Sequence, residues 1–138
     1  MKKVFEITNL QELQTVADEL INQMKENKIF LFYGEMGSGK TTLIGKLCNM
    51  IGVNRYSSPT YGIINNYLSP KFGEIYHVDC YRLSEETEAI SCGLVELMDE
   101  NEFCFIEWPE KIQNLLPQKH VKVTLKVLNN IREITLTL

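Results

Sequence analysis

The sequence predicts a single α/β domain over residues 1–138, in which helices flank a mostly parallel central sheet that also carries antiparallel strands. A continuous apolar run over residues 29–33 is typical of a strand that is buried on both faces of a parallel sheet. Apolar residues recur at helical spacing before and after this run, which predicts a helix on each side of it. From residue 121 onward apolar and polar residues alternate around a short turn, which predicts a C-terminal antiparallel hairpin.

The remaining elements follow from local patterns. Residues 4–7 are expected to form a short strand, after which Asn9 resembles the N-cap of a helix and Glu12 stands where a capping box has its acidic residue. Apolar residues at helical spacing, beginning at Leu10, are expected to pack this helix into the core. The later segments are expected to be a loop over 53–61, strands over 63–68, 74–80 and 102–107, and a helical region that Ser84 opens between the last two strands.

Composition and charge exclude several classes of protein. The net charge of −4 argues against a broad nucleic-acid-binding surface, which would be strongly basic. No apolar run approaches the length of a signal peptide or a membrane span, so the chain is expected to be cytoplasmic and to bind no membrane. The four cysteines make no C-x-x-C pair and no zinc-binding spacing, and they are expected to be buried, reduced thiols.

Residues 34–41 read Gly-Glu-Met-Gly-Ser-Gly-Lys-Thr and match the phosphate-binding P-loop pattern G-x-x-x-x-G-K-[ST] at every fixed position. The motif lies between the apolar strand and an apolar helical pattern that ends at Gly52, a C-cap signal. Its glycines let backbone N–H groups approach phosphate oxygens, and the helix N-terminus adds unpaired donors. Lys40 supplies a charge for the outer phosphates, and the Thr41 hydroxyl suits the accompanying Mg²⁺. The expected fold is therefore P-loop NTPase-like, and the alternative is an ordinary glycine-rich turn with a surface lysine.

Two acidic residues are candidates to complete this site. Asp79 and Glu107 each end a predicted strand, and the carboxyl ends of parallel strands meet at one edge of a sheet, where ligands bind. Both are expected to face the phosphates, and the alternative for each is a solvated acid or a helix cap. Trp108 follows Glu107 directly and fits either packing at the rim or a ligand-gated or partner surface. His77 alternates with Asp79, so both are expected on one face, the histidine as a packed, hydrogen-bonded side chain.

Four motifs occur together in the chain, at residues 34–42 (GEMGSGKTT), 58–61 (SPTY), 77–83 (HVDCYRL) and 106–110 (IEWPE). In this order they closely resemble the motifs of the TsaE (YjeE) family, the small bacterial ATPases of tRNA threonylcarbamoyladenosine biosynthesis. The P-loop alone is shared by many families, whereas the combination is much more specific. The resemblance spans the chain, with the flanks 1–28 and 111–138 matching in outline.

The resemblance implies a protein that binds ATP and Mg²⁺, hydrolyses ATP slowly on its own, and works with TsaB and TsaD. TsaD transfers the threonylcarbamoyl group, so tRNA is met indirectly through the complex. By motif position, Lys40, Asp79 and Glu107 are implied to be catalytic, and Thr41 and Glu107 are implied to hold the metal. The implied nucleotide-binding set is Met36, Gly37, Ser38, Gly39, Lys40, Thr41, Thr42 and Arg132, and the implied switch or partner set is Ser58, Pro59, Thr60, Tyr61 and Trp108.

Two other functions use the same P-loop. A small-molecule kinase needs a lid that brings arginines over the transferred phosphate, and the chain has only Arg55, Arg82 and Arg132. Arg82 is consistent with a phosphate clamp and with a plain surface salt bridge. A nucleotide-dependent binding switch would keep the pocket without needing turnover. No sequence motif selects adenine, so the choice of ATP over GTP rests on the resemblance.

Overall fold

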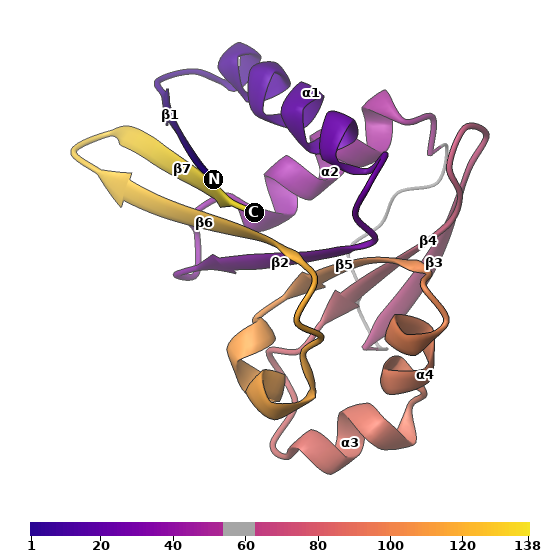
Figure 1. The fold of residues 1–138 in the computed structure, drawn as a ribbon. Helices are drawn as coiled ribbons and strands as arrows, with labels where there is room; N and C mark the ends of the chain where they lie inside the picture. Colours follow the sequence, from indigo (N-terminus) through magenta and orange to yellow (C-terminus); the bar gives the residue numbers. More distant parts are fainter. Residues whose placement is uncertain (54–62) are drawn as a thin grey trace.

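The structure, a computed structural model, describes residues 1–53 and 63–138 and shows an α/β fold built on a seven-stranded sheet (Figure 1). The expected switch-like loop of residues 58–61 lies outside the described residues. In chain order the described elements are β1 (Lys2–Ile7), the 3-10 helix η1 (Leu10–Glu12), α1 (Leu13–Gln23), β2 (Ile29–Gly34), α2 (Lys40–Met50), β3 (Ile64–Ser69), β4 (Gly73–Asp79), α3 (Glu86–Ser91), α4 (Leu94–Asp99), β5 (Phe103–Glu107), the 3-10 segment η2 (Pro109–Leu115), β6 (Val121–Leu128) and β7 (Ile131–Thr137).

The sheet has the strand order β1-β7-β6-β2-β5-β4-β3. Its centre is parallel as predicted, because β2 pairs in parallel with both β5 and β6, and β4 pairs in parallel with β5. The outer pairings β3–β4, β6–β7 and β1–β7 are antiparallel. The sheet is therefore mixed rather than mostly parallel, because short turns join β3 to β4 and β6 to β7, and such turns join only antiparallel neighbours. The predicted C-terminal hairpin is confirmed, and its turn uses Asn129 and Asn130 at left-handed φ angles of 48° and 70°.

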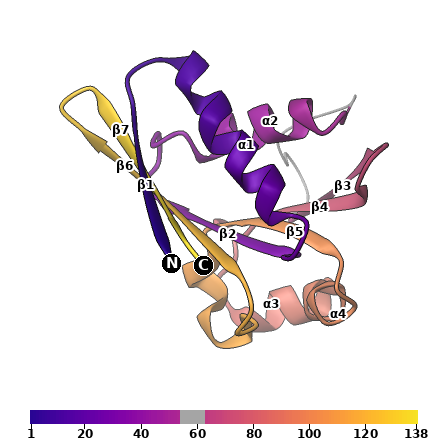
Figure 2. The ribbon, with the colours of Figure 1, turned by 45° about the horizontal axis from the view of Figure 1, so that its top comes forward.

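Helices cover both faces of the sheet. α1 and α2 lie on one face, and α3, α4 and η2 lie on the other (Figure 1 and Figure 2). Phe30 and Phe32 of β2 belong to the core on the α1–α2 side, where each packs edge-to-face against Phe105 at centroid distances of 5.6 and 6.2 Å. Leu31 belongs to the core on the opposite side. Burial on both faces explains the continuous apolar run that predicts this strand.

The N-terminal helix begins differently from the prediction. Asn9 caps the 3-10 turn η1, and its Oδ1 accepts a hydrogen bond from the Glu12 backbone N–H at 3.1 Å. The Glu12 side chain accepts in return from the Thr8 backbone N–H at 3.1 Å. In a capping box this acceptor would instead bind the backbone N–H of the N-cap residue, which here is Asn9. Leu10, expected in the core, is 66% exposed because it lies on this turn, and the buried stripe begins at Leu13.

The C-terminal end of α2 is tied to the β3–β4 turn. Gly52 has a left-handed φ of 84°, and the N–H of the next residue reaches back to the Cys48 carbonyl at 2.9 Å, which confirms the predicted C-cap as a Schellman arrangement. Ser69, buried at the end of β3, donates its hydroxyl to the Ile51 carbonyl at 2.6 Å. The same hydroxyl accepts from the Phe72 N–H at 3.2 Å. One serine therefore links the helix that follows the P-loop to the turn of a hairpin.

Two short helices, α3 and α4, form the helical region between β4 and β5. α3 begins at Glu86 rather than at Ser84, because the Ser84 N–H is bound by the Glu88 carboxylate at 3.0 Å ahead of the first turn. Glu86 also accepts from the Asn114 side-chain amide at 2.8 Å, which links α3 to η2. Across residues 1–53 and 63–138, no helix combines the length and the apolar character that crossing a membrane would need.

The cysteines differ from the prediction at one position. Burial raises the pKa of the Cys48, Cys80 and Cys104 thiols to about 12, so these three are the expected buried thiols. Cys92 is exposed, because it lies at the C-cap of α3, a short helix that buries only Ala89. The expectation of a buried thiol is therefore wrong for Cys92.

Replacing Ser69 with alanine is expected to lower the free energy of unfolding by about 1–3 kcal/mol, because a buried carbonyl and a partly buried N–H would both lose their partner. Urea denaturation of both proteins measures this difference. Ser91→Ala is the matched control, since Ser91 is exposed and its hydroxyl makes one bond to the Thr87 carbonyl. The control is expected to change stability by less than about 0.5 kcal/mol. Equal effects of the two substitutions would contradict the assigned role of Ser69.

Candidate functional site

The P-loop connects the end of β2 to the N-terminus of α2. Gly37 and Gly39 adopt left-handed φ angles of 81° and 105°, which other residues rarely adopt. A Cβ at Gly39 would also lie 2.8 Å from Nη1 of Arg132, so a side chain here would displace that guanidinium. The Ser38 N–H closes the loop on the Glu35 carbonyl at 3.0 Å. The first turn of α2 then presents N–H groups that a helix cannot satisfy internally.

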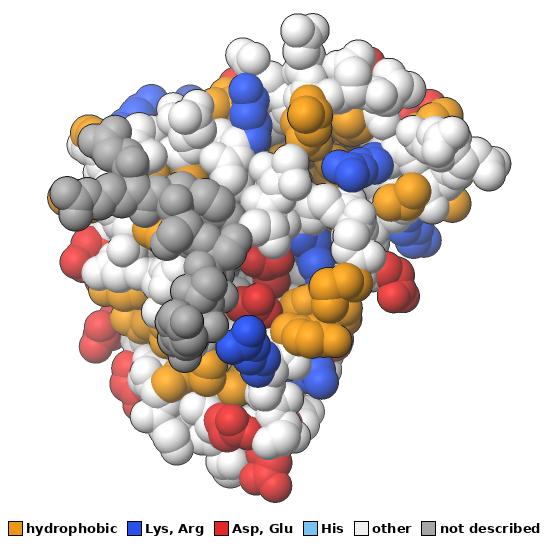
Figure 3. All heavy atoms as spheres, turned by 180° about the vertical axis from the view of Figure 1, so that it is seen from behind, with side chains coloured by type: hydrophobic (Ala, Val, Ile, Leu, Met, Phe, Trp, Pro, Cys, Tyr) orange, Lys and Arg blue, Asp and Glu red, His pale blue; other side chains and the backbone are white. Residues whose placement is uncertain are grey.

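A pocket of about 390 Å³ adjoins this loop at the C-terminal edge of the parallel strands. The edge collects Asp79 from the end of β4, Glu107 from the end of β5, and Arg132 from β7. On the face drawn in Figure 3, acidic and basic side chains lie close together in a hollow that hydrophobic side chains border. The pocket is lined by Met36, Gly37, Gly39, Lys40, Thr41, Thr42, Asp79, Tyr81, Arg82, Glu107, Trp108 and Arg132.

The carboxylate of Glu107 is the most buried acidic group of this pocket, with the residue only 3% exposed. Its Oε1 accepts a hydrogen bond from Thr41 Oγ1 at 3.1 Å. Its Oε2 lies 2.6 Å from Nε2 of His77, whose side chain is fully buried. The predicted pair of Thr41 and Glu107 is thus in direct contact, and His77 is the packed, hydrogen-bonded histidine that the sequence suggests.

Asp79 lies beside Glu107 because the two residues are register partners in the parallel pairing of β4 and β5. The Asp79 side chain is half-buried, and its Oδ1 accepts from the Tyr81 backbone N–H at 3.0 Å. The Cys80 N–H donates to the Glu107 carbonyl at 3.1 Å, which continues the ladder past the carboxylates. Two strand-end acids therefore face one pocket, as expected for neighbouring parallel strands.

Lys40 is buried at the start of α2, and its ammonium has two partners among the described residues. Nζ donates to the Gly34 carbonyl at 2.6 Å and lies 3.4 Å from the ring centroid of Trp108. Trp108 in turn packs against Tyr81, with ring centroids 5.0 Å apart. Burial lowers the pKa of the Lys40 ammonium, and the negative charges around it, that of Glu107 foremost, oppose this shift. Trp108 therefore lies in the pocket itself and contacts the P-loop lysine.

Ser38 differs from the rest of the predicted nucleotide-binding set. It does not line the pocket and is 2% exposed. Its Oγ is buried and has no hydrogen-bond partner among the residues that the structure describes. Only its backbone, as part of the loop, is available to a ligand in the pocket.

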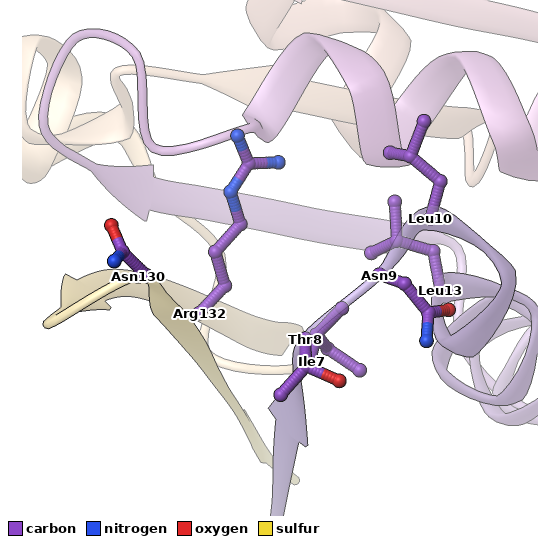
Figure 4. Close-up of a pocket in the computed structure, with 7 residues that line it drawn as sticks. All are labelled: Ile7, Thr8, Asn9, Leu10, Leu13, Asn130 and Arg132. Atoms are coloured by element: carbon purple, nitrogen blue, oxygen red, sulfur yellow. The ribbon is translucent and has the colours of Figure 1, made fainter.

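A second pocket, of about 240 Å³, escaped the sequence analysis (Figure 4). It forms where the end of β1 meets β7, because Ile7 and Arg132 are register partners in that antiparallel pair. Arg132 lines both pockets, and its guanidinium points toward the start of α2 (Figure 4). No local sequence pattern marks this pocket, because it depends on the pairing of β1 with β7, two strands from opposite ends of the chain. The lining residues are Ile7, Thr8, Asn9, Leu10, Leu13, Asn130 and Arg132.

The arrangement supports two kinds of binding chemistry. The N-terminus of α2, the Lys40 ammonium and the Arg132 guanidinium form a surface for a multiply charged anion. The Thr41 hydroxyl and the Glu107 carboxylate offer oxygen ligands of the type that Mg²⁺ prefers. Within the described part of the chain, no three His, Cys, Asp or Glu side chains group together as a metal site of their own.

Comparison with known proteins assigns the chain to a family. The family model described as "Threonylcarbamoyl adenosine biosynthesis protein TsaE" matches residues 7–134. A relative from Borreliella burgdorferi is 38% identical over 112 residues, which are 79% of this chain and 80% of that protein. A relative from Rickettsia prowazekii is 34% identical over 126 residues (90% and 86%), and one from Bacillus subtilis is 31% identical over 131 residues (94% and 81%). All three relatives carry the name tRNA threonylcarbamoyladenosine biosynthesis protein TsaE.

A solved structure has the same architecture. The crystal structure of YdiB from Bacillus subtilis matches with a TM-score of 0.76 and 25% sequence identity, covering 99% of this chain and 84% of that one. The likeness supports the mixed α/β sheet and its flanking helices as one shared fold. The match of the family model over most of the chain and the identity of the relatives lead to one conclusion: the chain belongs to the TsaE family of tRNA threonylcarbamoyladenosine biosynthesis proteins.

Proposed function

We propose that this chain binds ATP with Mg²⁺ at the P-loop and hydrolyses it slowly, as the ATPase component of the tRNA threonylcarbamoyladenosine machinery. In this proposal the fold is P-loop NTPase-like, and the protein acts with TsaB and TsaD, meets tRNA through them, and does not itself transfer the threonylcarbamoyl group. The observation that carries the proposal is the convergence of Lys40, Thr41, Asp79 and Glu107 on one pocket beside the N-terminus of α2. Membership of the TsaE family is the reason for proposing that the protein acts in tRNA threonylcarbamoyladenosine biosynthesis.

The phosphates would bind the backbone N–H groups of residues 36–42 and two cations. Lys40 can turn from the neutral carbonyl of Gly34 to a charged phosphate oxygen, which is the stronger acceptor. Arg132 reaches the opposite side of the loop, where its guanidinium lies against Gly39. The positive end of the α2 dipole adds to both charges.

Thr41 and Glu107 fit the magnesium ion that accompanies ATP. Their oxygens are 3.1 Å apart, and Mg²⁺ sites typically combine one or two protein oxygens with phosphate oxygens and water. When bound, the ion would neutralise charge on the phosphates. Asp79 lies next to Glu107 in the sheet and lines the same pocket, so its carboxylate is available to orient the attacking water.

The second pocket is suited to the base of the nucleotide. It adjoins the phosphate site through Arg132, and Ile7, Leu10 and Leu13 give it apolar walls. The polar side chains of Thr8, Asn9 and Asn130 lie among these walls, and a few polar groups in an apolar pocket are typical of small-molecule sites. The preference for ATP over GTP in this proposal comes from the family rather than from these residues.

Trp108 and Tyr81 suit a contact with partner proteins. Both line the phosphate pocket, and Tyr81 is 47% exposed. Exposed aromatic side chains are enriched in protein interfaces. Trp108 touches the P-loop lysine, so a partner that binds this aromatic pair would also affect the nucleotide site.

Lys40→Ala is expected to raise the Kd for a non-hydrolysable ATP analogue with Mg²⁺ by about 10- to 100-fold, because it removes a charged phosphate contact. Isothermal titration calorimetry measures this change. Lys46→Ala is the matched control, since Lys46 lies on the same helix and does not line the pocket. If the Lys40 variant bound the analogue as tightly as the Lys46 variant, the pocket would be misassigned.

Asp79→Asn and Glu107→Gln are each expected to lower the rate of phosphate release by about 100-fold or more, with a much smaller change in nucleotide affinity. The reason is that both groups are proposed to act on the metal or the water rather than on the base and the inner phosphates. A phosphate-release assay run beside calorimetry measures the two effects. Asp99→Asn serves as the control, because Asp99 is exposed at the end of α4. Full activity of an Asp79→Ala, Glu107→Ala double variant would rule out the proposed site.

Addition of TsaB and TsaD is expected to change the rate of phosphate release, and tRNA modification by the combined proteins is expected to require this chain. The reason is that an ATPase serving an assembly couples its turnover to the partners. Release of phosphate and formation of modified tRNA are measured with each component omitted in turn. An unchanged release rate together with full modification in the absence of this chain would contradict the proposed function.

A further inference from the structure

The Glu107 side chain is held in one orientation by neighbouring side chains rather than by its own backbone. A glutamate at the end of a strand has three rotatable side-chain bonds and can take many orientations. Here both carboxylate oxygens have a partner, with Thr41 on Oε1 and His77 on Oε2. The His77 contact is the shorter of the two, at 2.6 Å against 3.1 Å, and the His77 side chain is fully buried. His77 therefore determines which oxygen is left to face Thr41.

The strand register brings a second side chain to His77. Tyr67 on β3 pairs with Ile75 on β4, so His77 lies diagonally opposite the tyrosine on the same face of the sheet. The Tyr67 hydroxyl lies 3.2 Å from His77 Nδ1, in a buried position. It also accepts from the Asn65 side-chain amide at 3.4 Å. The chain of polar contacts thus runs across three neighbouring strands, from β3 through β4 to β5, and ends at the helix that follows the P-loop.

The hydrogen-bond partners select one form of the neutral imidazole. Oε2 of Glu107 only accepts, so the His77 proton belongs on Nε2, which leaves Nδ1 as an acceptor for the Tyr67 hydroxyl. In the other neutral tautomer, a lone pair on His77 Nε2 would face a lone pair on Glu107 Oε2 at a distance of 2.6 Å. A tyrosine that donates to Nδ1 therefore favours the tautomer that donates to Glu107.

We infer that Tyr67 and His77 are positioning residues that aim the Glu107 carboxylate at Thr41 and thereby raise the affinity of the pocket for the metal ion that accompanies the nucleotide. This inference rests on the proposed function, in which Thr41 and Glu107 hold Mg²⁺. Residues that orient metal ligands by hydrogen bonds often change metal affinity by 10- to 100-fold when they are replaced. A purely structural role would instead affect unfolding and leave metal binding unchanged.

The test measures metal binding directly, without turnover. Mn²⁺ replaces Mg²⁺ because it takes the same oxygen ligands and its free form is counted by electron paramagnetic resonance. The full chain with a non-hydrolysable ATP analogue is titrated with Mn²⁺. Tyr67→Phe keeps the ring beside His77 and removes only the hydroxyl, so the Kd for Mn²⁺ is expected to rise about 2- to 10-fold. His77→Leu is expected to raise it by about 10- to 100-fold.

Two further variants sharpen the result. His77→Gln retains an N–H donor for Glu107 and is expected to recover most of the affinity that His77→Leu loses. Tyr76→Phe is the matched control, because Tyr76 lies on β4 and its hydroxyl donates to Glu74 at an exposed position, away from Glu107. Affinity for the analogue without metal is expected to stay within about 2-fold of the wild type in all these variants, since no phosphate contact changes.

The outcomes separate this inference from the proposed function. If Tyr67→Phe and His77→Leu bind Mn²⁺ as tightly as the wild type does, and only their unfolding changes, the positioning role is overturned and the proposed function stands. If the wild type gains no Mn²⁺ affinity from the nucleotide, or if Thr41→Ala and Glu107→Gln leave that affinity unchanged, the proposed metal site itself is wrong. Should His77→Leu fail to fold, Tyr67→Phe against Tyr76→Phe decides the question alone.

Discussion

The buried carboxylate of Glu107 joins the sheet to the P-loop helix. An ionised group removed from water costs several kcal/mol unless its oxygens are hydrogen-bonded, so a carboxylate on a residue that is only 3% exposed requires donors. Thr41 at the start of α2 and His77 in β4 provide them. Satisfying this one group therefore fixes the N-terminus of the helix relative to two parallel strands. The position of the loop between β2 and α2 follows from that constraint, because both of its ends are then held.

The antiparallel strands add to the pockets at the C-terminal edge of the parallel centre. β7 carries Arg132 to the P-loop, and pairing of β1 with β7 brings the segment after Ile7 to the same place. Residues from both ends of the chain thus complete a surface that begins with the central strand β2. The antiparallel strands therefore take part in both pockets, because Arg132 on β7 lines each of them and the pairing of β1 with β7 places Ile7 opposite it.

Sequence patterns predict the parts of the site whose geometry is local. The P-loop glycines, the C-cap at Gly52 and the strand-end acids Asp79 and Glu107 depend on turns and on periods of two or 3.6 residues, which a short segment reveals. The second pocket could not be predicted, because it requires β1 to pair with β7, and residue patterns do not identify strand partners. The exposure of Leu10 escaped prediction for a related reason, since a 3-10 turn replaces the first turn of the expected helix.

The contacts of Lys40 explain how, among the residues that the structure describes, acidic and basic side chains can line one pocket without forming close ion pairs with each other. In the described part of the chain, the ammonium is held by a neutral carbonyl and an aromatic face rather than by a carboxylate. The two acids that line the pocket have other partners, because Glu107 is bound by Thr41 and His77, and Asp79 accepts from the Tyr81 N–H. A lysine in a close ion pair would have to break it before binding an anion, and the loss would offset most of the gain. A lysine held by weaker partners gains a charged acceptor at little cost. Separate partners for the acids and for the lysine are therefore compatible with the proposed binding of phosphate by Lys40 and of a metal ion by the carboxylates.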